Sequence, residues 1–456
     1  MHLANLTTAA IKKTAFLIFI VFSYTFASAQ ENSPYSRYGM GDIVPSQNMV
    51  SRSMGGISAG FIDSLGLIKY QNSQSINLSN PASLGSLGST TLFDLGGEID
   101  IRTLKSNTSP DKYKATNTLI SYLQLAFPIT SKRMAKKGYN WGVALGLKPL
   151  TRVNYKIQSD KRLTGIDSTS TLFEGTGGIS QVNISSGIKY KNFSFGISTG
   201  YSFGNKETST KLRFVNDTVP YKFSNSESQA NFGAVFVNLG AQYAIRLKDN
   251  DILRIGASAN LQQNLKATRN VINETFDYAS DGSIISIDTV TYLKEQAGTI
   301  KLPATYNAGF TYATKHWIVG ADIDVATWSQ YRFYGATDAV KNSMKLHVGG
   351  QYSPANDNTT TNKYWSFVKY RGGFYYGSDY IKIGTSSRPD YGVTLGLGMP
   401  LTPIRRLSFG DFVTLNTGVE IGQRGNKTNL SLRENIFRVN FGVSMSGAWF
   451  QKRKYD

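Results

Sequence analysis

The sequence predicts an all-β fold, a 14-stranded antiparallel transmembrane β-barrel that follows an N-terminal plug, or hatch. Three observations predict it: an export signal, a long series of segments in which apolar and polar residues alternate, and a low content of charged residues. Charged residues make up 17% of the chain, whereas soluble domains contain roughly 25%. The chain also holds 44 Gly, 26 Tyr and 25 Phe residues, which fits strands with aromatic side chains near lipid and small or polar side chains inside a barrel.

The overall composition excludes several classes of protein. The 456 residues include no Cys, which excludes a disulfide framework, a thiolate metal site and a cysteine nucleophile. Past the extreme N-terminus no run of about 18 apolar residues occurs, so membrane-spanning helices are excluded. The 49 Lys and Arg residues outnumber the 30 Asp and Glu residues, so the formal charge is 49 − 30 = +19. A basic excess of this size predicts a polyanionic partner, either nucleic acid or an anionic membrane surface.

The N-terminus has the three parts of a secretory signal peptide. Lys12 and Lys13 precede the apolar run 15–22, and the small residues 27–29 follow. A single membrane anchor helix is the alternative, and the shortness of the apolar run disfavours it. Cleavage near Ala29 would leave 456 − 29 = 427 residues and a charge of 19 − 2 = +17. Because the chain is exported, we expect no nucleic-acid partner, and the basic loops would instead meet the phosphates of lipopolysaccharide in the cell outer membrane.

Alternation with a period of two recurs throughout the mature chain. From Phe193 the apolar set is Phe193, Phe195, Ile197, Tyr201 and Phe203, and the residues between them are Ser194, Gly196, Ser198, Gly200, Ser202 and Gly204. In a strand these two sets lie on opposite faces. A similar split follows Trp317, where Val319, Ala321, Ile323 and Val325 oppose Asp322, Asp324, Gln330 and Arg332. Soluble sandwiches also alternate, so the number and length of the segments must decide.

Fourteen alternating segments can be counted. They begin near Thr91, Asn117, Asn140, Gly177, Phe193, Asn231, Ile252, Thr299, His316, Ser343, Trp365, Tyr391, Phe409 and Ile436. An even number lets one chain close an up-and-down barrel with both ends on one side, and closure removes the sheet edges that lipid cannot satisfy. Each crossing needs only about 9–11 residues, so the longest segments should project beyond the membrane. Tyr and Trp cluster near segment ends, as in the aromatic girdles of outer-membrane barrels.

The residues before the first segment have a different character. Residues 30–88 lack sustained alternation and are rich in Gly, Ser and Asn. They form either a disordered tail or a folded plug, and their scattered apolar residues and tight turns favour packing inside the lumen. The sequence therefore predicts a signal peptide over 1–29, a plug over 30–88 and a barrel over 89–456.

Short motifs in this plan resemble a known family. Asn80, Pro81 and Ala82 near the end of the plug, followed by fourteen strands, resemble the FadL/TodX-type outer-membrane transporters of hydrophobic compounds such as long-chain fatty acids. The stretches 33–39 (SPYSRYG) and 449–454 (WFQKRK) resemble the Bacteroidota branch of that family. The resemblance implies a plug that blocks the lumen and a small rearrangement that opens a path for hydrophobic ligands. Other relatives in the same phylum serve as accessory barrels of protein secretion or outer-membrane assembly machines.

Candidate ligand contacts can be read from the inward faces. A hydrophobic ligand needs an apolar path with a few placed polar groups, and the strand around Phe232 and Phe236 is apolar on both faces. These two residues are predicted either to line a ligand pocket or to pack against the plug. Alternation also places five cations inward as candidate carboxylate anchors, because a buried guanidinium can bind a carboxylate through two hydrogen bonds. They are Arg254, Arg332, Lys345, Lys369 and Arg371.

Enzymatic motifs find no support. Two Gly-x-Ser-x-Gly strings occur, at 196–200 and 56–60, but neither has the strand–turn–helix context of a nucleophile elbow. The two histidines of the mature chain, His316 and His347, form no motif with metal-ligand spacing. We therefore predict no catalytic residue, no metal and no cofactor.

Two functions remain as expectations. The first is diffusive uptake of a hydrophobic ligand, such as a long-chain fatty acid, through a plugged outer-membrane barrel. The second is a non-transporting accessory subunit of an outer-membrane protein assembly or secretion complex, with other proteins of that complex as partners. Uptake is the main prediction from the sequence, and the accessory subunit is its alternative.

Overall fold

The computed structural model of the protein describes residues 33–63, 73–88, 90–106, 112–162, 164–165, 167–216, 219–247, 251–355, 363–384, 388–402, 412–427 and 432–447. The predicted signal peptide and its cleavage site near Ala29 lie outside these residues, as does the C-terminal stretch 449–454. Within the described ranges, no helix has the length and apolar character needed to cross a membrane.

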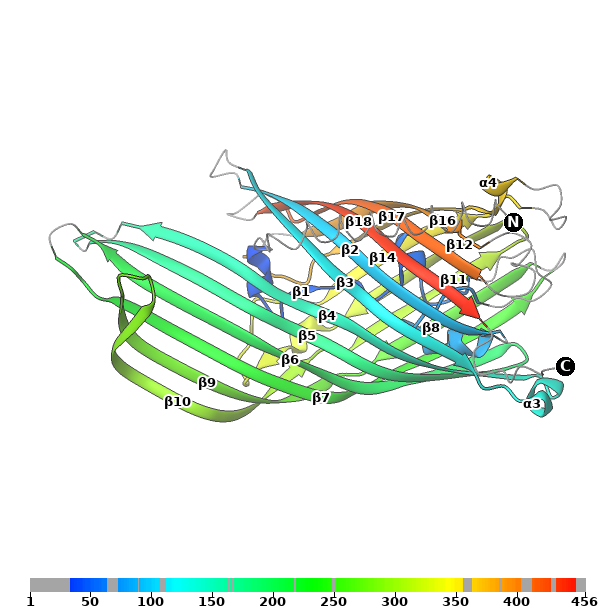
Figure 1. Ribbon diagram of the computed structural model, residues 1–456, viewed down its shortest axis with the longest axis horizontal. Helices are drawn as coiled ribbons and strands as arrows, with labels where there is room; N and C mark the ends of the chain where they lie inside the picture. The colour runs from blue at the N-terminus through cyan, green and yellow to red at the C-terminus, as the bar shows by residue number, and fades with distance from the viewer. Residues whose placement is uncertain are drawn as a thin grey trace, which may run out of the picture.

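The chain forms one closed antiparallel barrel (Figure 1). Its wall consists of β2 (Thr91–Lys105), β3 (Lys112–Pro128), β4 (Tyr139–Lys161), β5 (Ser168–Tyr190), β6 (Phe193–Val215), β7 (Phe223–Arg246), β8 (Ile252–Asn260), β9 (Gln263–Tyr278), β10 (Ile284–Leu302), β11 (Thr305–Ala313), β12 (Trp317–Ala326), β14 (Ser343–Tyr352), β15 (Lys369–Ser378), β16 (Pro389–Pro400), β17 (Phe412–Arg424) and β18 (Arg433–Gly447). β8 continues into β9 after a two-residue break, and β10 continues into β11 in the same way, so these sixteen segments make fourteen strands. Pairing of β18 with β2 closes the barrel. The predicted 14-stranded antiparallel barrel is confirmed.

Short elements complete the fold. They are η1 (Pro34–Arg37), β1 (Asp42–Ile43), α2 (Met49–Arg52), η2 (Pro81–Ser86), α3 (Lys132–Lys136), η4 (Trp328–Gln330), β13 (Arg332–Phe333) and α4 (Tyr364–Phe367). We call the end of the barrel where β2 begins and β18 ends the terminal end, and the opposite end the distal end. α3 and α4 lie at the terminal end, whereas β4 to β7, β9 and β10 extend far past the other strands at the distal end (Figure 1).

An apolar belt surrounds the barrel, and β6 shows where it stops. On the outward face of β6, every second residue from Phe193 to Phe203 is large and exposed, apart from Thr199. On the inward face, Ser194, Ser198 and Ser202 are buried. Past Phe203 the outward face becomes polar, with Asn205 first. The apolar stretch covers about the 9–11 residues of one bilayer crossing, and the remainder of β6, at ~3.3 Å per residue, extends about 40 Å further.

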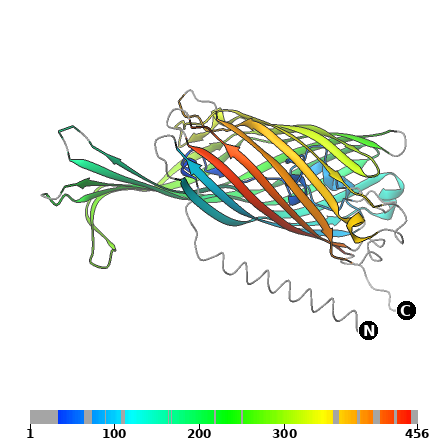
Figure 2. The same cartoon turned by 90° about the horizontal axis from the view of Figure 1, so that it is seen from above.

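The extended strands form a six-stranded sheet that we call the projection, seen from above in Figure 2. The projection has two open edges. At one edge β3 pairs with β4 only as far as Leu123 and Leu147, and beyond that point β4 pairs with the short strand β1 instead. At the other edge, β10 pairs on its outer side, among the described residues, only with β13 at Ile300 and Lys301. Since lipid does not tolerate open edges, this sheet must stand in water.

The described part of the N-terminal segment, 33–63 and 73–88, lies inside the barrel. It begins with η1 at the distal end and reaches η2 near the terminal end, visible as the blue elements between the walls in Figure 1. Asparagine side chains cap two of its turns: Asn48 accepts a hydrogen bond from Ser51 at the start of α2, and Asn80 accepts one from Ala82 at the start of η2. Most residues of the segment are buried, although Arg37 and Ile43 are exposed, so most of its backbone is packed.

One local prediction from alternation is wrong. The pattern after Trp317 would carry β12 through Gln330 and Arg332, but β12 ends at Ala326. The 3₁₀ turn η4 follows, and Arg332 belongs to β13, which pairs with β10. The turn is held by hydrogen bonds from Gln330 to Thr327 and from Tyr331 to Trp328, contacts that a two-residue periodicity does not reveal.

Candidate functional site: the filled lumen

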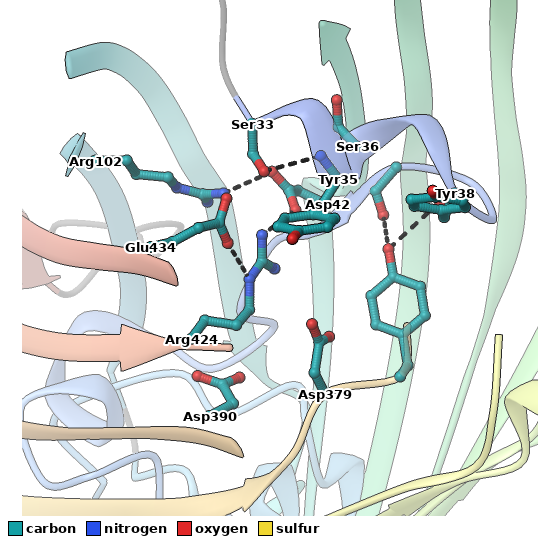
Figure 3. Close-up of polar contacts among 12 residues, drawn as sticks. Ser33, Tyr35, Ser36, Tyr38, Asp42, Arg102, Asp379, Asp390, Arg424 and Glu434 are labelled. Carbon is teal, nitrogen blue, oxygen red and sulfur yellow. Dashed lines mark hydrogen bonds and ion pairs between the residues drawn. The ribbon is translucent and has the colours of Figure 1, made fainter. Parts of the chain in front are cut away.

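A carboxylate of the N-terminal segment is clamped at the distal end (Figure 3). Asp42 accepts hydrogen bonds from Arg102 at 2.6 Å and from Arg424 at 2.7 Å. Arg102 also pairs with Asp100 at 2.8 Å, and Arg424 pairs with Glu434 at 2.5 Å. All five side chains are at least 90% buried. The clamp thus joins β1 to three strands of the wall, β2, β17 and β18.

A second cluster follows deeper in the lumen. Arg52, at the end of α2, forms a buried ion pair with Glu98 of β2. Arg438 of β18 lies beside it and pairs with Glu420 at 2.7 Å and with Asp100 at 3.2 Å. Charges of opposite sign therefore alternate across β2, β17 and β18. Such pairs remain strong only while both partners stay buried together.

An aromatic contact holds the first turn of the segment. The guanidinium of Arg388 stacks on the ring of Tyr35 at 3.7 Å, within the range of a cation–π contact. The hydroxyl of Tyr35 also hydrogen-bonds with Leu432 near the start of β18. Ser33 accepts a hydrogen bond from the backbone of Tyr35 at 3.1 Å. The SPYSRYG stretch therefore acts as a packed turn at the distal end of the lumen.

Two further carboxylates hold the segment toward the terminal end. Asp322 of β12 accepts hydrogen bonds from the backbone N–H groups of Ser58 at 2.5 Å and Ala59 at 2.7 Å. Asp63 pairs with Lys369 of β15 at 2.7 Å. Burial by itself would raise the pKa of Asp63, but the nearby charges of Lys369 and Arg371 hold this pKa below its ordinary value. Asp63 is therefore ionised at neutral pH and attracts both cations.

Asn80 and Pro81 sit where the segment touches the wall most closely. The Asn80 amide donates hydrogen bonds to the carbonyl of Ala59 at 2.7 Å and to the carbonyls of Ala241 and Ala257 at 3.2 Å each. A Cβ atom on Gly240 would overlap the Asn80 side chain. The wall therefore needs glycine there, and the predicted Asn-Pro-Ala motif is a wedge between the segment and two strands.

A cavity of about 370 Å³ remains between the segment and the wall. Many of its lining residues are polar or ionised, among them Asn183, Ser198, Asn238, Asn307, Lys345 and Glu420, but apolar atoms form more of its surface than polar atoms do. Apolar side chains such as Phe236 and Leu302 contribute to one part. An alkyl chain in this cavity would lie against amide and charged groups that need hydrogen-bonding partners. The cavity therefore presents both apolar surface and polar groups to whatever fills it.

The predicted ligand contacts have different surroundings. Phe232 packs in a buried cluster with Tyr35 and Met40 of the N-terminal segment, whereas Phe236 lines the cavity. Lys345 pairs with Asp390 at 2.5 Å, Lys369 with Asp63 as above, and Arg371 with Gln351 at 2.6 Å and Asn416 at 2.8 Å. Arg332 donates to the carbonyls of Ser329 and Tyr331 outside the lumen cluster.

Arg254 differs from the other four cations. It is 5% exposed on the inward face of β8, and no acceptor contacts it among the described residues. Its role as a ligand contact stays a prediction, as do the roles of the other candidates.

Sequence reasoning did not identify the carboxylates and cations that clamp the segment. These residues are Asp42, Arg52, Asp63, Arg102, Asp322, Arg424 and Arg438. A signal was present, because Asp42, Arg52 and Asp63 are three of only six charged residues in 30–88, a region that is otherwise rich in Gly, Ser and Asn. Charged side chains inside a packed segment need partners of opposite sign.

The architecture of this barrel was compared with that of known proteins. Solved structures share the fold at low sequence identity. The Pseudomonas putida toluene transporter TodX is 16% identical with a TM-score of 0.51 over 90% of this chain and 100% of its own. The Ralstonia pickettii toluene transporter TbuX is 15% identical with a TM-score of 0.50 over 88% and 98%. A Pseudomonas aeruginosa FadL homologue is 14% identical with a TM-score of 0.51 over 89% and 98%.

These structures show that the chain has the barrel fold of FadL-type outer-membrane channels. No curated protein matches the chain in sequence. The family model described as BamG matches residues 10–456. The chain therefore belongs to the BamG family.

Proposed function

We propose that this protein is a non-transporting accessory subunit of an outer-membrane protein assembly or secretion complex. The observation that carries the proposal is the filling of the lumen by a buried segment that ion pairs fasten to the wall at several heights. In this function the N-terminal segment 30–88 is a permanent plug, and the barrel serves as a membrane anchor for the projection.

The energetics of the clamps support a permanent plug. Separating one buried ion pair costs about 3–5 kcal/mol, because each charge is left without its partner. The pairs of Asp42, Arg52 and Asp63 lie at different heights of the lumen. Releasing the three together would cost about 9 kcal/mol or more. A plug held in this way would open too rarely to support transport without an outside trigger.

The projection supports the same function. A barrel that only admits ligands needs strands long enough to cross the bilayer, about 9–11 residues. β4, β5 and β6 have 23 residues each, and β7 has 24. Both chain ends of the barrel lie at the terminal end, as is usual for the periplasmic side. The projection would then stand on the cell surface, where it could contact other proteins.

Purification from native outer membranes in mild detergent tests this function. We expect the barrel to elute with protein partners in fixed ratio, and a strain that lacks it to take up oleate at the normal rate. Two results together would show that the assignment is wrong: the purified barrel elutes alone with bound lipid, and a strain that lacks the barrel no longer takes up oleate.

The second candidate function is diffusive uptake of hydrophobic molecules such as long-chain fatty acids. Arg254 favours it, since a buried guanidinium without a described acceptor is suited to a carboxylate. Parting of β3 from β4 beyond Leu123 also leaves a place where a ligand could leave the wall sideways. Under this function Arg254→Ala should lower oleate uptake at least tenfold, and Arg246→Ala at the exposed end of β7 is the matched control. Unchanged uptake in Arg254→Ala would remove the main support for transport.

A further inference from the structure

The β9–β10 hairpin lies at one edge of the projection and bends away from the other extended strands (Figure 2). Six large apolar residues of β10 are more than 40% exposed: Ile284, Ile285, Ile287, Val290, Tyr292 and Leu293. Val290 is 72% exposed, the highest value among the large apolar residues of the described chain. The outward face of the same sheet is already polar at Asn205 of β6, so this cluster lies outside the apolar belt. Exposed apolar clusters in water mark contact sites.

The two edges of the projection are built differently. Past its pairing with β3, the stretch of β4 from Lys148 to Lys161 is covered by β1 only at Thr151 and Arg152. It carries five charged side chains and Pro149, the features by which natural sheets discourage pairing at an edge. The stretch from Ile284 to Leu293 of β10 carries a single charged residue, Asp288. The β4 edge is therefore protected against pairing, whereas the β10 edge is not. That asymmetry points to a specific contact at β10.

Bulges turn apolar residues of β10 away from the ladder. Register shifts fall between Ser286 and Asp288 and between Thr289 and Thr291, so Ile287 and Val290 have no partner in β9. Bulges bend a strand and redirect side chains. Ile287 and Val290 are therefore presented as protruding apolar side chains, a shape suited to a pocket on another molecule and poorly suited to regular strand addition.

The charge of the hairpin indicates what would occupy it. Residues 270–295 contain five acidic residues and one basic residue, a net charge of 1 − 5 = −4 in a chain of +19 overall. The phosphates of lipopolysaccharide would be repelled by this charge. In a dimer with a two-fold axis through the hairpin, the net charge of −4 on one hairpin would face the same charge on its partner. Like-charge repulsion disfavours such a dimer. A protein with a basic surface would instead be attracted by the acidic hairpin.

We propose that the β9–β10 hairpin docks a partner protein whose contact surface has an apolar pocket for Ile287 and Val290 and a rim of Lys and Arg. This inference rests on the proposed function as a complex subunit and names the surface through which the complex forms. Asp281, Asp288 and Glu295 are exposed around the apolar cluster and face the basic rim. Opposite charge at the rim speeds association, whereas the buried apolar centre holds the complex together.

Photo-crosslinking of the full chain in its native membrane tests the surface. A photoreactive amino acid replaces Val290 in one strain and Gln158, an exposed residue of β4, in the control strain. We expect the Val290 position to form an adduct with a protein that also co-purifies in fixed ratio, and the Gln158 position to form none with it. An adduct of Val290 with a second copy of this chain, with lipopolysaccharide or with no molecule would overturn the proposal.

Substitution then separates this proposal from the function on which it rests. Ile287→Asp combined with Val290→Asp should reduce the co-purifying protein at least tenfold, and Gln158→Asp should leave it unchanged. Retention of the full complex by the double variant would overturn the docking surface and leave the proposed function standing. Absence of any co-purifying protein from the unmodified chain would overturn the function itself. The crosslink at Val290 does not depend on how the double variant folds.

Discussion

Asp42 and Arg424 are 382 positions apart in the chain, yet the carboxylate of Asp42 accepts a hydrogen bond from the guanidinium of Arg424 at 2.7 Å. The contact ties β1, near the start of the N-terminal segment inside the barrel, to a strand near the C-terminus. Because Arg102 reaches the same carboxylate at 2.6 Å, a single side chain keeps two guanidinium groups together. Loss of its charge would remove the carboxylate that the two buried cations share, and each would keep only its second partner, Asp100 or Glu434.

Asp42→Asn should therefore loosen the distal part of the segment. We expect a cost of about 3–5 kcal/mol, since the change breaks two buried ion pairs and leaves Arg102 and Arg424 with one carboxylate each, Asp100 and Glu434. Proteolysis within residues 33–63, measured in detergent micelles, should become at least a hundredfold faster. Asp277→Asn is the control, because the pair of Asp277 with Lys222 is about half exposed and such pairs contribute only about 0–1 kcal/mol. Equal cleavage rates in the two variants would contradict the clamp.

The dependence on pH follows from Asp42 and Asp63. In each case burial would raise the pKa of the carboxyl, but the paired cations hold it below the ordinary 3.8. A lowered pKa in the folded state stabilises the fold fully above the unfolded pKa, and the stabilisation is lost as the pH falls through the folded value. The melting temperature should thus lose no contribution from these pairs between pH 8 and pH 5, and should lose it only below about pH 3.8.

Comparison with Asp63→Asn isolates that contribution. The variant lacks the ionised carboxyl at every pH, so its melting temperature should lie below that of the unmodified protein at pH 7. The difference between the two should shrink below pH 3.8 as Asp63 becomes protonated. A difference that grows on acidification would show that the ion pair with Lys369 does not stabilise the plug.

Replacing the donor amide of Asn80 with an acceptor should destabilise the fold. Asn80→Asp replaces a donor that serves three carbonyl oxygens with an acceptor, and a buried polar group without a partner costs about 1–3 kcal/mol. Gly240→Ala should have a similar effect from the other side, by pushing the Asn80 side chain away. Both variants should lower the melting temperature, and Gly372→Ala, at a strand glycine whose added Cβ would meet only ordinary van der Waals contacts, tests whether any lost glycine does so.

The absence of cysteine makes the membrane boundary directly measurable. Single cysteines at Ile197 and Arg213, both exposed on the outward face of β6, should react differently with a water-soluble maleimide in intact membranes. We expect slow labelling at Ile197, inside the apolar belt, and fast labelling at Arg213, in the projection. A cysteine at Ser198 reports on the lumen, where the buried position should stay unlabelled. Fast labelling at Ile197 would mean that the belt has been placed wrongly.

Alternation predicts the membrane-crossing halves of the strands and fails in the projection for a physical reason. Within the belt, each strand separates lipid from a polar interior, so its two faces must differ. Past Phe203 both faces of β6 meet water, and the contrast fades at Asn205 and Glu207. For the same reason β5 begins at Ser168 rather than near Gly177, and β10 begins at Ile284 rather than near Thr299.

The sequence alone could not predict the ion pairs between the N-terminal segment and the wall, because closure of the barrel is what brings the two partners together. Asp63 meets Lys369 across 306 positions, and nothing local to either residue indicates the other. Inward parity did identify Lys369 as a lumen cation. It could not tell whether the acceptor would be a ligand or a carboxylate of the plug.

The break between β10 and β11 separates two tasks within one strand. β11 pairs with β12 and so seals the barrel, whereas β10 leaves the seam and continues into the projection. β8 and β9 divide in the same way opposite them, since β8 pairs with β11 and β9 with β10. The shear and circumference of the barrel are therefore set by the strands on the terminal side of this break, independently of the strands on its distal side. Residues can be added to or removed from the β9–β10 hairpin in pairs without changing the barrel, which makes the hairpin a part that can diverge from one homologue to the next while the membrane anchor stays constant.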